Sequence, residues 1–393
     1  MRIDRTPLLS HLLLLILSMA AVASSRLTLF HMENLFLTLL FLTSTSCVSV
    51  SPYNIPAIFS FGDSIFDAGN NHFIKNCTAQ ADFPPYSSSF FHHPTGRFTN
   101  GRTVVDFISQ FIGIDFQIPY LEAKIAVMKG SRKSYPHNGI NFASAGSGVL
   151  RGTNKEERVI PMQDQLQQFR TLVEQNLIDR SLVQKSFFFF EAGSNDIFNY
   201  FLPSNTPKPD PHAYVQAMLV EVETFVDQIY KFGARKIALF SLGPVGCVPA
   251  RALLPGAPNN RCYGKMNVMV KEYNRGLESL VEHMHIKYPH AIGVYGAIYN
   301  IVQKFRANPT HYRFSDVGNA CCGDGTLGGM LQCGKKGYKI CSNRNSFLFW
   351  DFFHPSEHAY KLLSKALWGG RKSRIRPFNL KTLANITLHS GLD

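Results

Sequence analysis

Charged residues are scarce in this sequence. Asp, Glu, Lys and Arg make up 17% of its 393 residues, whereas an average soluble protein contains about 25%. Disordered chains and coiled coils need more charge and less apolar bulk. The 45% of apolar residues therefore excludes both classes and predicts a sizeable core. Lys and Arg outnumber Asp and Glu by 40 to 27, so the protein is a polycation at neutral pH.

Clustered basic residues, which nucleic-acid binding requires, are also rare. The one dense basic run is Arg371–Arg376, close to the C-terminus, and the remaining positive charge is spread thinly. The sequence therefore predicts no nucleic-acid partner. It favours a solvated basic tail or attraction to an anionic matrix.

Apolar runs long enough to cross a membrane are absent. The longest early runs, Leu12–Met19 and Leu35–Leu42, are shorter than the roughly 20 residues that span a bilayer. Two arginines precede the first run and the small-x-small sequence Ala21–Ala23 follows it, which is typical of a secretory signal. We expect residues 1–50 to be a leader, either a single long one or a doubled start with a second initiator at Met32.

Two C-x-x-C pairs, which a structural zinc site would favour, are missing although the chain has eight cysteines. Cys47 lies in the expected leader, and four of the other seven crowd into residues 321–341. An oxidising compartment favours disulfides over zinc, and an odd number leaves one thiol without a partner in the chain. The sequons at Asn76 and Asn385 predict N-glycans on surface loops.

Internal repeats, linkers and breaks in composition are absent after residue 50, so we expect residues 51–393 to form one domain. Short apolar runs alternate with amphipathic segments, which is typical of an α/β fold with a parallel sheet covered by helices on both faces. The expected strands are 55–61, 139–143, 186–191, 236–241 and 292–295, and the expected helices are 102–112, 163–177, 214–230 and about 266–287. Asp210 and Pro211 have the residue types of an N-cap and a first helical position.

Polar residues follow the ends of the expected strands, where the active site of a doubly wound sheet lies. Gly62-Asp63-Ser64 follows the first strand, Ser144–Gly148 the second and Gly193–Asp196 the third, and the loop Trp350–Pro355 comes after the fifth. Together they supply a serine, a glycine-rich turn, an asparagine and an Asp-x-x-His pair. These are the groups that serine acyl transfer requires.

Each residue type has a role in that chemistry. Ser64 would attack an acyl carbonyl, His354 would take its proton, and Asp351 would orient the imidazole. Pro355 suits the first turn of a helix that would fix His354 just outside it.

Donors to the oxyanion are expected from three places in the same region. They are the backbone N–H of Ser64, that of Gly148 and the side-chain amide of Asn195. Gly146, in the same glycine-rich turn, is the alternative to Gly148.

Three other functional motifs are absent or lack the surroundings that they require. No G-x-S-x-G elbow exists, which excludes the α/β-hydrolase version of a triad. His354–His358 spells H-x-x-E-H, but Pro355 places the first histidine at a helix start and no further acidic ligand follows until Asp393. Gly323–Gly328 spells the dinucleotide fingerprint without a preceding strand. We therefore expect no metal and no nucleotide cofactor.

Four ordered blocks of the sequence resemble the plant GDSL esterase/lipase family of the SGNH hydrolases. The blocks are Phe61–Asn71, Asn141–Gly148, Gly193–Asp196 and Asp351–Pro355. The resemblance covers residues 55 to about 382, with Ile65 in place of the leucine that names the family. It implies a flavodoxin-like, three-layer α/β/α fold around a five-stranded parallel sheet, and esterase or acyltransferase activity without a cofactor.

The resemblance also implies site roles and a setting. Ser64 would be the nucleophile, Asp351 and His354 the charge-relay pair and Asn195 an oxyanion donor. The expected protein is a secreted esterase or lipase of the cell wall that hydrolyses acyl esters of lipids or of acylated cell-wall sugars. Two alternatives remain: an acyltransferase that uses the same residues, and a catalytically idle wall-binding glycoprotein whose basic surface holds polyanions.

Overall fold

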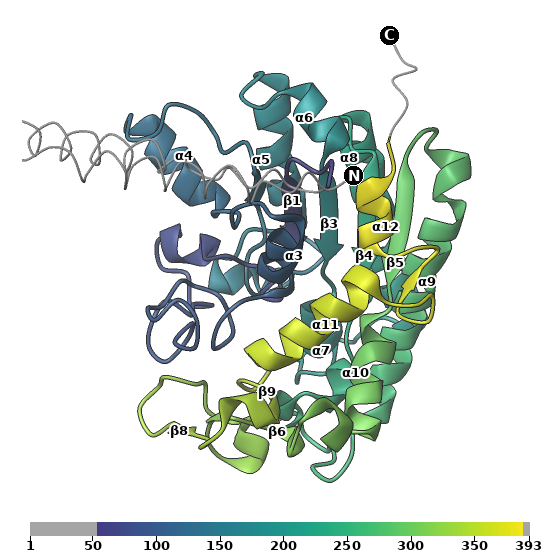
Figure 1. Cartoon of the computed structure of the whole chain (residues 1–393). Coiled ribbons are helices and arrows are strands. Elements are labelled where there is room, and N and C mark those ends of the chain that lie inside the picture. The colour runs from purple at the N-terminus through teal and green to yellow at the C-terminus, as the bar shows by residue number, and fades with distance from the viewer. Residues whose placement is uncertain (1–52, 388–393) are drawn as a thin grey trace, which may run out of the picture. The chain divides into compact units, whose positions relative to one another are not determined.

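A six-stranded sheet forms the centre of the computed structural model, which describes residues 53–387 (Figure 1). The strand order is β10-β5-β4-β3-β1-β2. The five predicted strands are present as β1 (Ile58–Gly62), β2 (Gly139–Asn141), β3 (Phe187–Glu191), β4 (Lys236–Phe240) and β5 (Ile292–Gly296). They pair in parallel, so the predicted α/β class and five-stranded parallel sheet are confirmed. The expected leader, with Cys47 and Met32, lies outside the described residues.

The sheet has a sixth strand that the sequence analysis missed. β10 (Ile375–Arg376) pairs antiparallel with β5 at the edge of the sheet. Two residues are too few to show the alternation by which a strand is recognised. The strand also falls inside the basic run 371–376. The charged neighbours of its one buried residue, Ile375, leave no apolar run that would indicate a strand.

Helices cover both faces of the sheet, as the predicted three-layer arrangement requires. α3 (Val104–Ile112) and α11 (Glu357–Gly369) pack together on one face, turned toward the viewer in Figure 1. α5 (Met162–Glu174), α8 (Pro211–Lys231) and α9 (Gly264–Lys287) form a continuous layer behind. The four predicted helices, α3, α5, α8 and α9, are thereby confirmed. The sequence analysis missed α4 (Tyr120–Met128), α6 (Arg180–Lys185), α7 (Ser194–Tyr200), α10 (Ile298–Ala307) and α12 (Leu380–Asn385).

The start of α8 shows how local sequence places a helix. The Asp210 side chain accepts hydrogen bonds from the backbone N–H groups of His212 and Ala213. Pro211 occupies the first helical position, where the missing N–H costs nothing because that group has no partner within the helix. The predicted cap and proline are therefore confirmed.

The segment 316–349, which precedes the last helices, has little regular structure and is stabilised by disulfides. Two short sheets, β6 (Asp316–Ala320) with β9 (Phe347–Phe349) and β7 (Cys322–Gly323) with β8 (Lys339–Ile340), form there. The disulfides are Cys321–Cys341 and Cys322–Cys333 in this segment and Cys247–Cys262 elsewhere. Cys77 is buried and is the free cysteine among the described residues, which accounts for the odd thiol.

None of the helices in residues 53–387 is long and apolar enough to cross a membrane.

Candidate active site

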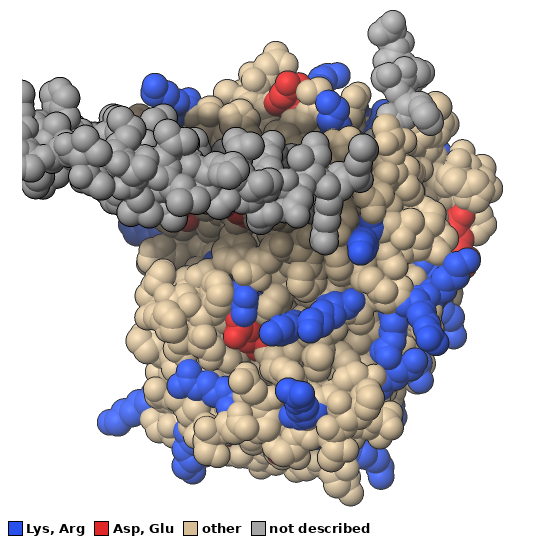
Figure 2. Space-filling model, in the orientation of Figure 1, with Lys and Arg blue, Asp and Glu red and all other residues tan. Residues whose placement is uncertain are grey.

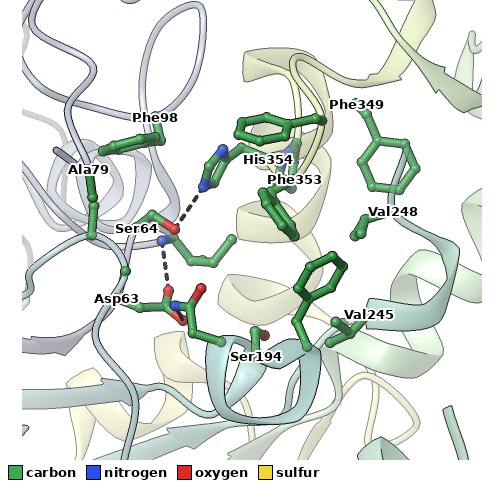
Figure 3. A pocket seen from close by; sticks show the side chains of 18 of the residues that line it. Asp63, Ser64, Ala79, Phe98, Ser194, Val245, Val248, Phe349, Phe353 and His354 are labelled. Carbon is green, nitrogen blue, oxygen red and sulfur yellow. Dashed lines mark hydrogen bonds between the residues drawn. The ribbon is translucent and has the colours of Figure 1, made fainter. Parts of the chain in front are cut away.

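Ser64, His354 and Asp351 meet at the carboxyl end of the sheet. Ser64 lies two residues beyond β1, and the other two lie in the loop between β9 and α11. His354 Nε2 is 2.7 Å from Ser64 Oγ, and His354 Nδ1 is 2.8 Å from Asp351 Oδ1. Figure 3 marks the bond between His354 and Ser64 with a dashed line. All three side chains are buried. The structure therefore brings together three residues that the sequence separates by up to 290 positions.

A turn around Asp351 fixes the imidazole. Its Oδ1 also accepts the backbone N–H groups of Phe353, at 2.9 Å, and of His354, at 2.8 Å. The Asp-x-x-His spacing thus lets one carboxylate hold both the backbone and the ring of the histidine. The expectation that Pro355 would begin the next helix is wrong, because α11 begins at Glu357 behind an N-cap at Ser356.

Tyr86 supports Asp351 from the other side. Its hydroxyl donates to Asp351 Oδ2 at 2.7 Å. Burial, followed by the nearby Asp351 charge, raises the pKa of Tyr86 well above its usual value. The phenol therefore keeps its proton and acts as a neutral donor that stabilises the carboxylate. The sequence offered no signal for this contact between residues 265 positions apart.

Asn195 lies beside the serine, in the first turn of α7. Its Nδ2 donates to the Ser147 carbonyl at 2.9 Å and to Asp63 Oδ2 at 3.3 Å. Gly193, at the start of the helix, has a φ of 123°, a conformation that favours glycine. The amide is thus held at the cavity wall next to Ser64.

The two candidate glycines of the second block lie in different surroundings. Gly146 lines the cavity that contains Ser64. Gly148 packs against Asp196, and a side chain at this position would begin 2.4 Å from the Asp196 carboxylate. Of the two glycines, Gly146 is the one among the residues that line the cavity.

Side chains of the first two blocks hold each other in place. Asp67 accepts backbone N–H groups from Gly69, Asn70 and Ala145 at 2.7 to 2.9 Å. Asn70 in turn donates to the Asn141 and Ala143 carbonyls, each at 2.8 Å. These bonds tie the serine turn to the glycine-rich turn, so the fold sets the position of Ser64 relative to that turn.

A second buried acidic residue lies next to the serine turn and was missed by the sequence analysis. Glu191, the last residue of β3, faces Asp63, and both are almost fully buried. Burial raises the pKa of Asp63 to about 6 and raises the pKa of Glu191 well above its usual value. Two acids that share one buried place cannot both ionise, so the pair holds a proton at neutral pH. The sequence contained one signal for this pair, which is that a single acidic residue ends a strand of four phenylalanines.

The cavity at the site has a volume of about 520 Å³, within the range of small-molecule sites. Polar residues contribute to its lining, among them Asn154, Glu157 and Gln332. Much of the remaining lining is apolar and includes Val245, Val248, Leu253, Ile298, Val302, Leu348, Phe349, Phe352, Phe353 and Leu363. Figure 3 shows Phe353, Phe349 and Val248 together on one side of His354, so an acyl chain bound to Ser64 would meet apolar surface there.

The residues of the H-x-x-E-H sequence contact three different partners. His354 bonds Ser64, Glu357 forms an ion pair with Arg102 at 2.7 Å, and His358 Nε2 lies 3.0 Å from the Tyr312 carbonyl. Within residues 53–387, no group of three or more His, Cys, Asp or Glu side chains is arranged to hold a metal ion.

A serine, a histidine and an aspartate joined by hydrogen bonds in this order are the constellation of serine hydrolases. Comparison with known proteins narrows this class. The sequence model of the GDSL-like lipase/acylhydrolase family matches residues 58–367. The chain therefore belongs to that family and is a serine ester hydrolase.

Curated relatives agree along nearly their whole length. The chain is 64% identical over 351 residues to GDSL esterase/lipase 6 of Arabidopsis thaliana, a match that covers 89% of this chain and 96% of the relative. It is 31% identical over 370 residues to GDSL esterase/lipase 5 of the same organism, covering 89% and 93%. It is 32% identical over 345 residues to GDSL esterase/lipase 7, covering 84% and 92%.

Proposed function

We propose that this enzyme hydrolyses acyl esters of lipids or of acylated cell-wall sugars through an acyl-enzyme on Ser64. The 2.7 Å contact between Ser64 Oγ and His354 Nε2 is the observation that carries the proposal. As Oγ attacks the acyl carbon, His354 takes its proton, and Asp351 holds the other ring N–H. The imidazolium then protonates the leaving alcohol. A water molecule then attacks the acyl-enzyme in the same way, with His354 as the base. This step releases the acid and restores Ser64.

The oxyanion of each tetrahedral intermediate needs donors that face the attacked carbon. We assign them to the backbone N–H of Gly146 and the Asn195 amide, both at the wall of the cavity. The 3.3 Å contact of Asn195 with Asp63 is longer than its 2.9 Å contact with Ser147. The weaker contact is the one that the amide exchanges for the oxyanion.

Removal of the Asn195 amide is expected to slow the reaction without unfolding the enzyme. An oxyanion donor contributes about 10²- to 10³-fold to kcat, so Asn195→Ala should lower kcat for p-nitrophenyl butyrate by that factor with little change in KM. Asn199→Ala is the matched control, because Asn199 lies one turn further along α7 and donates to Asn154. A control loss as large as that of Asn195→Ala would contradict the assigned role.

Activity itself is tested with p-nitrophenyl acetate and butyrate, and the ratio of the two rates reports the depth of the acyl pocket. Turnover by the mature protein that depends on Ser64 and Asn195 supports the proposal. A correctly folded wild type that acts on neither these esters nor a longer-chain ester would overturn it.

We also propose that residues 51–393 are a single hydrolase domain, secreted to the cell wall after removal of a leader at residues 1–50. The three disulfides fit an oxidising compartment. Asn76 and Asn385 are exposed, as N-glycosylation requires. The face in Figure 2 carries many more basic than acidic side chains, which suits an anionic matrix.

Glycans at these two positions predict a measurable mass change. The protein secreted from a eukaryotic host should lose mass on treatment with peptide N-glycosidase, and Asn76→Gln with Asn385→Gln should abolish that loss. No mass change for the wild type would contradict the glycosylation proposal.

A further inference from the structure

Positive charge is concentrated in two segments near the C-terminus. Residues 298–313 and 358–387 contain ten Lys and Arg residues and no Asp or Glu, in a chain whose net charge is +13. One of these ten cations, Arg376, forms an ion pair with Glu278 of α9. The other nine form no ion pair with any side chain within residues 53–387. Their charge is therefore available to a partner.

The fold brings the two segments together. α10 and α11 are in contact, and Tyr312, at the end of the 3-10 helix Thr310–Tyr312, bonds to two parts of the second segment. Its carbonyl oxygen lies 3.0 Å from His358 Nε2 on α11, and its hydroxyl accepts a hydrogen bond from Arg374 Nη2 at 3.3 Å. Six cations of these neighbouring elements make up what we call the basic strip: Arg313, Lys361, Lys365, Arg371, Lys372 and Arg374. All are exposed except Arg374, which is partly buried.

The basic strip is elongated. Lys361 and Lys365 are one turn apart on α11, about 6 Å along the helix axis. The helix has 13 residues and is therefore about 20 Å long, and the loop part of the strip follows directly beyond its end. Figure 2 shows basic side chains over α11 and over this loop, with no acidic side chain between them. Glu357, at the start of α11, is paired with Arg102. Such a row of cations fits an extended polyanion better than one small anion.

The uncharged residues of the two segments narrow the class of polyanion. The exposed large apolar side chains of the described chain all lie outside these segments, whereas a membrane surface is bound by inserted apolar residues as well as by charge. The aromatic side chains of the segments are all buried or partly buried, so none is presented as a platform on which the bases of single-stranded nucleic acid stack. Charge complementarity alone remains, which suits a polysaccharide that carries a carboxylate on each sugar.

We propose that the basic strip binds a linear acidic polysaccharide through its carboxylates and so holds the enzyme on the polymer. None of the six cations lines the cavity that contains Ser64, so a bound polymer leaves the cavity free for an ester. Leu363, between the two lysines of α11, is buried and does line the cavity, so one helix serves the site with one face and the polymer with the other. This inference rests on the proposed secretion to an anionic wall and names the surface that binds there. It does not depend on the reaction at Ser64.

The test measures binding of the full-length mature protein to immobilised polygalacturonate at pH 6. The Kd should rise about tenfold or more between 50 and 200 mM NaCl, because salt screens the contacts and competes for the polyanion. A variant with four cations of the strip replaced by glutamine should bind about tenfold more weakly than the wild type at 50 mM NaCl. Its substitutions are Lys361→Gln, Lys365→Gln, Arg371→Gln and Lys372→Gln.

The matched control removes the same number and types of exposed cations from a different surface, at and after α4. Its substitutions are Lys124→Gln, Lys129→Gln, Arg132→Gln and Lys133→Gln. Both variants have the same net charge, so the control should bind within about twofold of the wild type if the position of the charge matters. Both should hydrolyse p-nitrophenyl butyrate like the wild type, and circular dichroism checks their folds.

Equal losses in the two variants would show that net charge and not the basic strip binds the polymer, and would overturn the inference. So would a wild type that does not bind polygalacturonate, that binds its fully methyl-esterified form equally well, or that prefers anionic phospholipid vesicles or single-stranded DNA. Ser64→Ala should bind like the wild type, which separates the two proposals. A wild type that binds the polymer through the strip but hydrolyses no ester and is not labelled at Ser64 by a fluorophosphonate overturns the proposed reaction alone.

Discussion

Replacement of Ser64 by alanine should lower kcat for p-nitrophenyl acetate by about 10⁴- to 10⁶-fold, the range that follows loss of a triad nucleophile. Without Oγ no acyl-enzyme can form, and the residual rate reflects only binding and oxyanion stabilisation. The substitution removes a single oxygen from a nearly buried side chain. It should therefore leave the free energy of unfolding close to that of the wild type.

Covalent labelling gives an independent check of the same prediction. A fluorophosphonate should add its mass to the peptide that contains Ser64 in the wild type and to no peptide in Ser64→Ala. The exposed Ser373→Ala is the control and should be labelled and active like the wild type. A folded Ser64→Ala enzyme that keeps a tenth of the activity would show that Ser64 is not the nucleophile.

Asp351→Asn should have the next largest effect, a loss of about 10⁴-fold in kcat. Asparagine fills the same space, but it can present N–H to His354 Nδ1 and so stabilise the tautomer that cannot accept the serine proton. It also replaces the charge that stabilises the imidazolium. The backbone N–H bonds of Phe353 and His354 to Oδ1 can persist with an amide oxygen, so the loop should keep its shape.

Tyr86→Phe tests how much the hydrogen bond from Tyr86 to Asp351 contributes, apart from the charge of Asp351 itself. This variant removes the 2.7 Å bond to Oδ2 but keeps the contact between Asp351 and His354. It should cost far less activity than Asp351→Asn, and a comparison of kcat for the two variants makes the measurement. Equal losses would mean that Asp351 acts by holding Tyr86 and not by orienting the imidazole.

The strands and the position of the site could be predicted because each rests on a local pattern. Buried strands such as Phe187–Glu191 are continuous apolar runs, and polar residues at the ends of parallel strands must share one edge. Features fixed by three-dimensional packing could not be predicted. The contact of Tyr86 with Asp351 and the Asp63–Glu191 pair each join residues from separate elements.

Details of short range also depend on packing. The sequence analysis preferred Gly148 to Gly146 as a backbone donor, whereas Gly146 lines the cavity and Gly148 packs against Asp196. Pro355 is a reasonable first helical residue, yet the Ser356 side chain accepts the Ala359 N–H and moves the helix start beyond it. Local propensity thus located the helix to within a turn, and a side-chain cap fixed its first residue.

The distance in sequence between Ser64 and His354 has a consequence for biosynthesis. A ribosome completes β1 and Ser64 early, but 290 further residues must follow before His354 exists. A chain that ends between these two residues therefore contains the serine and lacks the histidine that contacts it. In the proposed mechanism, a partly made protein therefore has no hydrolytic pair until the loop before α11 has been synthesised and α11 has packed against α3.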